Sequence, residues 1–165
     1  MAELDKRAVL EAFKSRLQQE LERATKRARE AASGVTHEEN RAEGDKDMRA
    51  TEASYVARGQ ASRVAEMEEA VTRLAALELL EFAPEARIAL SALVELEHNG
   101  KRLHYFLLPA GGGEKVLLGG VEIQALTTQS PLGRTLLGLA QGDVAELPTL
   151  RPGEPERVYE VLRVR

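Results

Sequence analysis

The stretch SGVTHEENRAEGDKDMRAT, residues 33–51, lies between two long segments with helical periodicity. If the flanking helices fold back on each other, this polar segment becomes the tip of a rod. Composition alone favours a solvated loop over a tip that presents carboxylates to a metal ion. The segment has three cations (Arg41, Lys46 and Arg49) and five carboxylates: Glu38, Glu39, Glu43, Asp45 and Asp47.

The segment before it, residues 4–32, is predicted to form one long helix. Its apolar residues recur at spacings of three and four, which places them on a single narrow stripe suited to one partner helix. Gly34 is expected to end this helix, because glycine readily adopts the left-handed conformation found after a helix C-terminus. The stripe consists of Leu10, Phe13, Leu17, Leu21, Ala24, Ala28 and Ala31.

A second helix is predicted from about Asp45 or Asp47 to about Phe82, where Pro84 closes it. An alternative start lies at Thr36, which with Glu39 has the spacing of a capping box. In that case Glu39 and Glu43 share one helical face, whereas a later start leaves all five carboxylates in an exposed loop. The predicted seam of this helix consists of Met48, Tyr55, Ala61, Val64, Met67, Val71, Leu74 and Leu77.

Beyond Pro84 the periodicity changes from 3.6 to 2, which predicts short strands. Ser130 and Pro131 are expected to be the N-cap and first residue of a short helix over residues 132–139. An α+β protein is therefore predicted: an antiparallel helical hairpin (a coiled coil) over residues 1–82, favoured over a compact bundle, and a small β-rich domain with one short helix over residues 83–165. The strands are expected at residues 88–97, 103–108, 115–118, 121–128, 144–147 and 157–164, with an Asn99-Gly100 hairpin turn after the first.

Composition narrows the function classes. The 165 residues carry a formal net charge of −4, which argues against non-specific binding along duplex DNA. The chain has no cysteine, which excludes disulfides and thiolate metal sites. Neither a signal peptide nor an apolar run of membrane-spanning length is seen, so a cytoplasmic protein is expected.

The sequence contains no recognisable set of catalytic residues. Gly111, Gly112 and Gly113 precede a predicted strand, whereas a phosphate loop needs a helix at that point. His98 and His104 flank a turn without further metal ligands in sequence, so surface or edge positions are favoured. The acidic segment, together with His37 and Asn40, has the ligand chemistry for weak Mg²⁺ binding.

Two stretches resemble the bacterial Gre-type transcript cleavage factors: TTQSPLGRTLLGLAQGDVAEL, residues 127–147, and YEVLRVR, residues 159–165. The resemblance implies an FKBP-like C-terminal domain that docks on RNA polymerase, with the hairpin entering the secondary channel and coming near the nascent RNA. It implies an accessory factor that assists the polymerase's own active site, without membrane or sequence-specific DNA binding and with no cofactor of its own, Mg²⁺ being supplied there. Acids at the hairpin tip, here Glu39, Glu43, Asp45 and Asp47, then help to hold this Mg²⁺ and to orient the attacking water.

The tip departs from the family's pattern, which reads roughly G-D-x-x-E-N-A-E-Y. Matching E-N selects Glu39 and Asn40 but puts Thr36 in place of the first acid. Matching G-D selects Gly44 and Asp45, with Tyr55 downstream, but puts Met48 in place of the glutamate.

Two alternatives follow. One is a polymerase-binding inhibitor or competitor of the same fold without cleavage activity. The other is an FKBP-like chaperone or peptidyl-prolyl isomerase, disfavoured because only Tyr105, Phe106 and Tyr159 are available beyond the hairpin to line an aromatic pocket.

Overall fold

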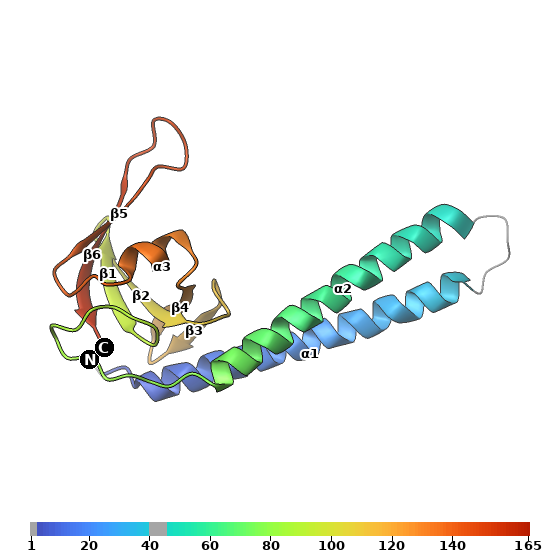
Figure 1. The fold of residues 1–165 in the computed structure, drawn as a ribbon, viewed down its shortest axis with the longest axis horizontal. Coiled ribbons are helices and arrows are strands. Elements are labelled where there is room, and N and C mark those ends of the chain that lie inside the picture. Colours follow the sequence, from blue (N-terminus) through green and yellow to red (C-terminus); the bar gives the residue numbers. More distant parts are fainter. Residues whose placement is uncertain (1–2, 40–45) are drawn as a thin grey trace. The chain divides into compact units, whose positions relative to one another are not determined.

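The computed structural model of the chain describes residues 3–39 and 46–165. In these residues two long helices precede a six-stranded sheet and a short helix (Figure 1), which confirms the predicted α+β class. The chain divides into two compact units, residues 17–72 (the hairpin unit) and residues 1–16 with 73–165 (the sheet unit). The predicted domains, residues 1–82 and 83–165, divide the chain at a single point of the sequence, unlike these units. That division stays a prediction. The elements are α1 Lys6–Glu39, α2 Lys46–Ala75, β1 Leu93–His98, β2 Lys101–Leu108, β3 Lys115–Leu118, β4 Val121–Thr127, α3 Pro131–Leu136, β5 Val144–Leu147 and β6 Arg157–Val164.

Helix α1 continues beyond the predicted stop. Gly34 lies within the helix, and so does Thr36, which is therefore not the cap of a second helix. An interior glycine costs only about 1 kcal/mol relative to alanine, and the backbone hydrogen bonds of the following residues outweigh that cost. The predicted stripe is confirmed where side chains are described, since all its members are buried or half-buried.

Helix α2 begins at Lys46, which confirms the later of the two predicted starts. Its seam differs from the prediction, because Met48 and Tyr55 are 78% and 77% exposed and Ala61 is also exposed. Residues on one face of a helix recur at alternating steps of three and four. Counted back from Leu74, these steps reach small residues near the start of α2 and miss its large apolar residues there, Met48 and Tyr55. The half-buried and buried positions among the described side chains of α2 are Ala50, Ala53, Ser54, Ala57, Gln60, Val64, Met67, Ala70, Val71 and Leu74.

Helix α2 also ends earlier than predicted, at Ala75 rather than Phe82. The segment after it is held by the sheet unit instead: the backbone N–H of Leu80 donates to Ser91 Oγ at 2.9 Å, and Phe82 packs against the core. Pro84 therefore does not end the helix. Tertiary contacts of the preceding segment already override its helical preference. None of the described helices is long and apolar enough to cross a membrane.

The sheet has the strand order β3-β4-β2-β1-β6-β5, in which β2 and β4 are parallel and the other neighbours antiparallel. The predicted turn between β1 and β2 is confirmed, with φ of 52° at Asn99 and 74° at Gly100. Strand β1 starts later than predicted, at Leu93, because Ser91 adopts a φ of 71° that interrupts an extended chain.

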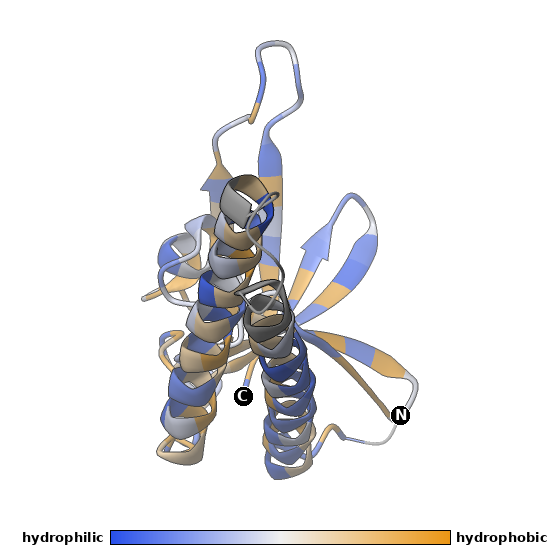
Figure 2. Ribbon diagram, turned by 90° about the vertical axis from the view of Figure 1, so that its right-hand side faces the viewer, coloured by the Kyte–Doolittle hydropathy of each residue, from blue (hydrophilic) through white to orange (hydrophobic). Residues whose placement is uncertain are grey.

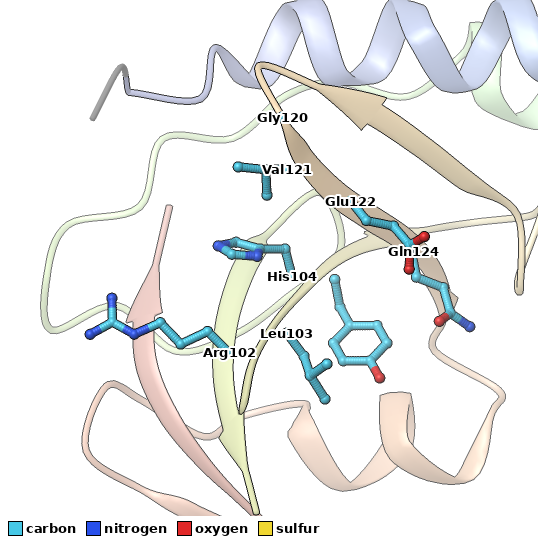
Figure 3. A pocket seen from close by; sticks show the side chains of 8 residues that line it. Arg102, Leu103, His104, Gly120, Val121, Glu122 and Gln124 are labelled. Carbon is cyan, nitrogen blue, oxygen red and sulfur yellow. The ribbon is translucent and has the colours of Figure 1, made fainter. Parts of the chain in front are cut away.

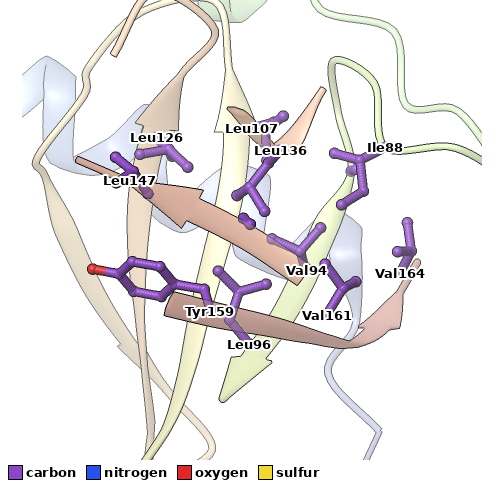
Figure 4. Packing of buried hydrophobic residues seen from close by; sticks show 12 residues of the cluster. Ile88, Val94, Leu96, Leu107, Leu126, Leu136, Leu147, Tyr159, Val161 and Val164 are labelled. Atoms are coloured by element: carbon purple, nitrogen blue, oxygen red, sulfur yellow. The ribbon is translucent and has the colours of Figure 1, made fainter. Parts of the chain in front are cut away.

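The core of the sheet unit lies on one face of the sheet (Figure 4). Leu107 of β2 and Leu96 of β1 are fully buried there, and Leu136 of α3 closes over them. On the same sheet, Phe106 is also fully buried and its ring centroid lies 6.2 Å from that of Phe13 in α1. Because neighbouring residues of a strand point to opposite faces, both faces of β2 are packed.

Candidate functional site

The predicted tip acids fall around the connection between α1 and α2. Glu39 is the last residue of α1, and Asp47 is the second residue of α2; their side chains are outside the described set. Glu43 and Asp45 fall in residues 40–45, which lie outside the described residues. The choice among these four acids as metal or catalytic groups stays a prediction.

Helix polarity distinguishes the acids by their place in the sequence. Asp47 falls in the first turn of α2, where the positive end of the helix dipole stabilises a carboxylate. Glu39 falls at the C-terminus of α1, where the dipole disfavours negative charge and a cation would relieve it. Among the side chains that the structure describes, those of residues 3–34 and 48–165, no group of three or more aspartates, glutamates or histidines is placed to hold a metal ion.

The stretch at residues 127–147 owes much of its composition to local structure. Ser130 Oγ accepts a hydrogen bond from the backbone N–H of Gly133 at 3.1 Å and donates to the carbonyl of Thr127 at 2.8 Å. Pro131 occupies the first turn of α3, as predicted, although the helix ends at Leu136 rather than at residue 139. A side chain at Gly133 would place its Cβ 1.9 Å from the Thr127 carbonyl oxygen, so only glycine fits.

The end of the same stretch is also fixed by the fold. Asp143 Oδ2 accepts from the backbone N–H of Ala140 at 2.8 Å, and Gly142 adopts a φ of 90°. The carbonyl of Asp143 then accepts from Val161 of β6, which fastens this turn to the sheet. The Ser-Pro and Gly-Asp signals therefore report structural roles in the sheet unit.

Replacing Ser130 by alanine is expected to lower the free energy of unfolding by about 1 kcal/mol, the usual cost of losing a helix N-cap. The loss is expected because the hydroxyl satisfies the Gly133 N–H and also anchors to Thr127. Urea denaturation measures it. The variant Ser130→Thr retains the hydroxyl and should recover most of the stability, and equal losses in both variants would contradict the capping role.

The two histidines on the β1–β2 hairpin have separate partners. His98 Nδ1 donates to the carbonyl of Val158 at 2.7 Å, Asn99 donates to its Nε2, and its ring stacks on Tyr159. His104 lies opposite Glu95 on the paired strand. Both side chains are half-buried on the central strands β1 and β2, rather than at the predicted surface or edge positions. Among the described side chains they are not part of a group of three or more metal ligands.

The three glycines form a loop that leads into a strand, as the sequence indicated. Gly113 donates its N–H to the carbonyl of Ala125 at 2.9 Å, and β3 begins at Lys115. A strand, not a helix N-terminus, comes directly after these glycines, so they do not have the arrangement that cradles phosphate.

A pocket of about 310 Å³ lies over strands β2 and β4 (Figure 3). Burial lowers the pKa of His104; Glu95 opposes this shift, while Arg165 and Arg102 add to it. Burial also raises the pKa of the neighbouring Tyr105. Both polar and apolar residues line this pocket: Arg102, Leu103, His104, Tyr105, Gly120, Val121, Glu122 and Gln124.

A second pocket, of about 380 Å³, is lined in part by Lys6, a residue for which no role was predicted. Lys6 Nζ donates to the carbonyl of Leu80 and lies 4.5 Å from the centroid of the Phe82 ring. Burial lowers the pKa of Lys6 to about 8, against the opposing effect of Glu81. No sequence pattern signals this site, because its parts come from segments more than 70 residues apart.

No protein-family model and no curated protein matches the chain. Among solved structures, it is similar to GreA factor homolog 1 (Gfh1) of Thermus thermophilus, with 27% identity over 93% of this chain and 95% of that one and a TM-score of 0.38. Thermus aquaticus Gfh1 has 25% identity over 93% and 94%, with a TM-score of 0.37. The GreA/GreB elongation factor of Nitrosomonas europaea has 23% identity over 59% and 78%, with a TM-score of 0.35. The chain is thus similar to solved structures described as a GreA factor homolog and as a GreA/GreB elongation factor, each at a TM-score below 0.5.

Proposed function

We propose that this protein is a transcription elongation factor that binds RNA polymerase and inserts its helical hairpin into the secondary channel. The observation that carries the proposal is the position of the acidic segment at the connection between α1 and α2. The part of α1 in the hairpin unit, from Leu17 to Glu39, spans about 35 Å at ~1.5 Å per residue. A narrow rod of that length with acids at its end suits delivery of carboxylates into a channel.

The chemistry assigned to the hairpin is assistance in trans. Mg²⁺ in the polymerase active site would supply Lewis acidity for phosphodiester hydrolysis. The tip carboxylates would add negative charge beside that ion and orient the attacking water by accepting its hydrogen bonds. The protein would then act without an active site or cofactor of its own.

A second candidate, a channel-occupying inhibitor without cleavage activity, is favoured by one described residue. Met48 stands where the Gly-Asp register requires a glutamate, and its side chain is 78% exposed in α2. A thioether cannot replace a carboxylate on Mg²⁺, which takes oxygen ligands. In the other register the glutamate, Glu39, closes α1, so the two registers use different helix ends.

A stalled, backtracked elongation complex with Mg²⁺ distinguishes the two candidates. If the cleavage proposal holds, adding the protein accelerates shortening of the RNA from its 3′ end. Binding to the polymerase with unchanged or slower shortening would support the inhibitor, and absence of binding would contradict both.

Variants that replace the tip carboxylates by amides, tested two acids at a time, identify which acids assist cleavage. We expect Asp45→Asn with Asp47→Asn, or Glu39→Gln with Glu43→Gln, to slow cleavage by about 100-fold while polymerase binding is retained. The matched control is Glu66→Gln, which removes an exposed carboxylate of α2 away from the connection. Equal cleavage by both double variants and the control would exclude a role for these acids.

A further inference from the structure

We propose that Lys6 is a selective acylation site, at which a half-buried amine accepts the acyl group of a small activated donor. The chemistry required of the donor is shared by acyl phosphates and acyl thioesters. This inference concerns the sheet unit and stands apart from the proposed action on the polymerase.

The Lys6 amine is held in place rather than free in solvent. Lys6 is the first residue of α1, and its Nζ reaches the segment after α2, where it donates to the Leu80 carbonyl. The Phe82 ring lies under the same nitrogen, 4.5 Å away at its centroid. These two contacts fix the nitrogen at the wall of the pocket of about 380 Å³, a volume within the usual range of small-molecule sites.

Apart from Lys6, three arginines and three carboxylates line this pocket, and the arginines can bind an anionic donor. Arg163 Nη2 donates to Glu3 Oε1 at 3.2 Å, while Arg165 Nη1 lies 3.8 Å from the same oxygen. Arg165 Nη1 is buried and has no hydrogen-bond partner among the described residues. Arginine side chains donate strongly to phosphate, and Arg7, Arg163 and Arg165 all line this pocket.

The amine is also more available for reaction than an ordinary lysine amine. With its pKa lowered to about 8, roughly half of Lys6 is unprotonated at pH 8, against about 0.3% for a lysine at 10.5. Weaker intrinsic nucleophilicity at lower pKa offsets part of this gain, as it does for thiols. The charged groups that line the pocket together with Lys6 are Glu3, Asp5, Arg7, Glu81, Arg163 and Arg165.

The reaction is an ordinary acyl transfer. The Nζ lone pair attacks the acyl carbonyl carbon and forms a C–N bond. The bond to the phosphate oxygen or thioester sulfur breaks and its electron pair leaves with that group, while the extra amine proton passes to water. The product is a neutral amide that can still donate to Leu80 but no longer places a cation over Phe82.

The test treats the full chain at pH 8 with acetyl phosphate and, separately, with acetyl-coenzyme A, and measures initial acetylation rates of each lysine by mass spectrometry. We expect Lys6 to react about tenfold faster than Lys101, which is exposed in the β1–β2 hairpin. Preference with one donor alone assigns the source to that class, and preference with both assigns the site to either. Reaction of Lys6 no faster than Lys101 with both donors overturns the proposal.

A pH–rate profile separates a built site from mere accessibility. The Lys6 rate should reach half its plateau near pH 8, and Glu81→Gln should move that midpoint to lower pH because it removes the charge that stabilises the ammonium. Glu85→Gln, an exposed neighbour in sequence, is the matched control and should leave the midpoint unchanged. A midpoint near 10.5 in the wild-type chain would overturn the proposal.

Discussion

Replacing Gly133 by alanine is expected to lower the free energy of unfolding of the sheet unit by about 3 kcal/mol or more, at the upper end of overpacking effects. The new Cβ would lie 1.9 Å from the carbonyl oxygen of Thr127. That oxygen cannot move aside easily, because it accepts hydrogen bonds from both the N–H and the hydroxyl of Ser130. Urea denaturation followed by the near-ultraviolet circular dichroism of the sheet tyrosines measures the change.

Gly112 provides the matched control for this prediction. A Cβ there would meet the same residue, Thr127, but at its terminal Cγ2 methyl group, 2.9 Å away. The methyl group can rotate with its side chain, so Gly112→Ala should cost no more than about 1 kcal/mol. Equal unfolding midpoints for the two variants would show that the clash at Gly133 is relieved elsewhere.

Replacing Phe13 by alanine is expected to destabilise the sheet unit by about 3–5 kcal/mol, the usual cost of truncating a buried phenylalanine. Phe13 is only 1% exposed and packs with Phe106 of β2, although its sequence position is in a helix. The measurement is the urea midpoint reported by the sheet tyrosines, with hydrogen exchange of the β2 amides as a second probe.

Tyr55→Ala is the control for the second prediction, because it removes an aromatic ring that is 77% exposed on α2. We expect a change within about 0.5 kcal/mol, as for most surface substitutions. If Phe13 served only the helical hairpin, its replacement would leave protection of the β2 amides unchanged.

Hydrophilic and hydrophobic residues are interspersed along both long helices (Figure 2). This pattern was enough to predict two helices but not which residues of each are buried. Periodicity correctly marked the α1 stripe, yet it assigned Met48 and Tyr55 to the α2 seam, although both are exposed. Each residue of a helix is rotated by about 100° from the one before it, so a small error in register exchanges a buried position for an exposed one.

The features that were predicted correctly depend on local sequence signals, and those that were not depend on long-range contacts. The sequence by itself determined the hairpin turn at Asn99-Gly100, the cap at Ser130 and the short strands, because turn and cap preferences depend on neighbouring residues. It also located the acidic connection, while the register of the acids stays a prediction. Only the tertiary structure decided where α2 ends and what surrounds Lys6. In both cases the partner, Ser91 for Leu80 and Leu80 for Lys6, comes from another segment, and no local preference records it.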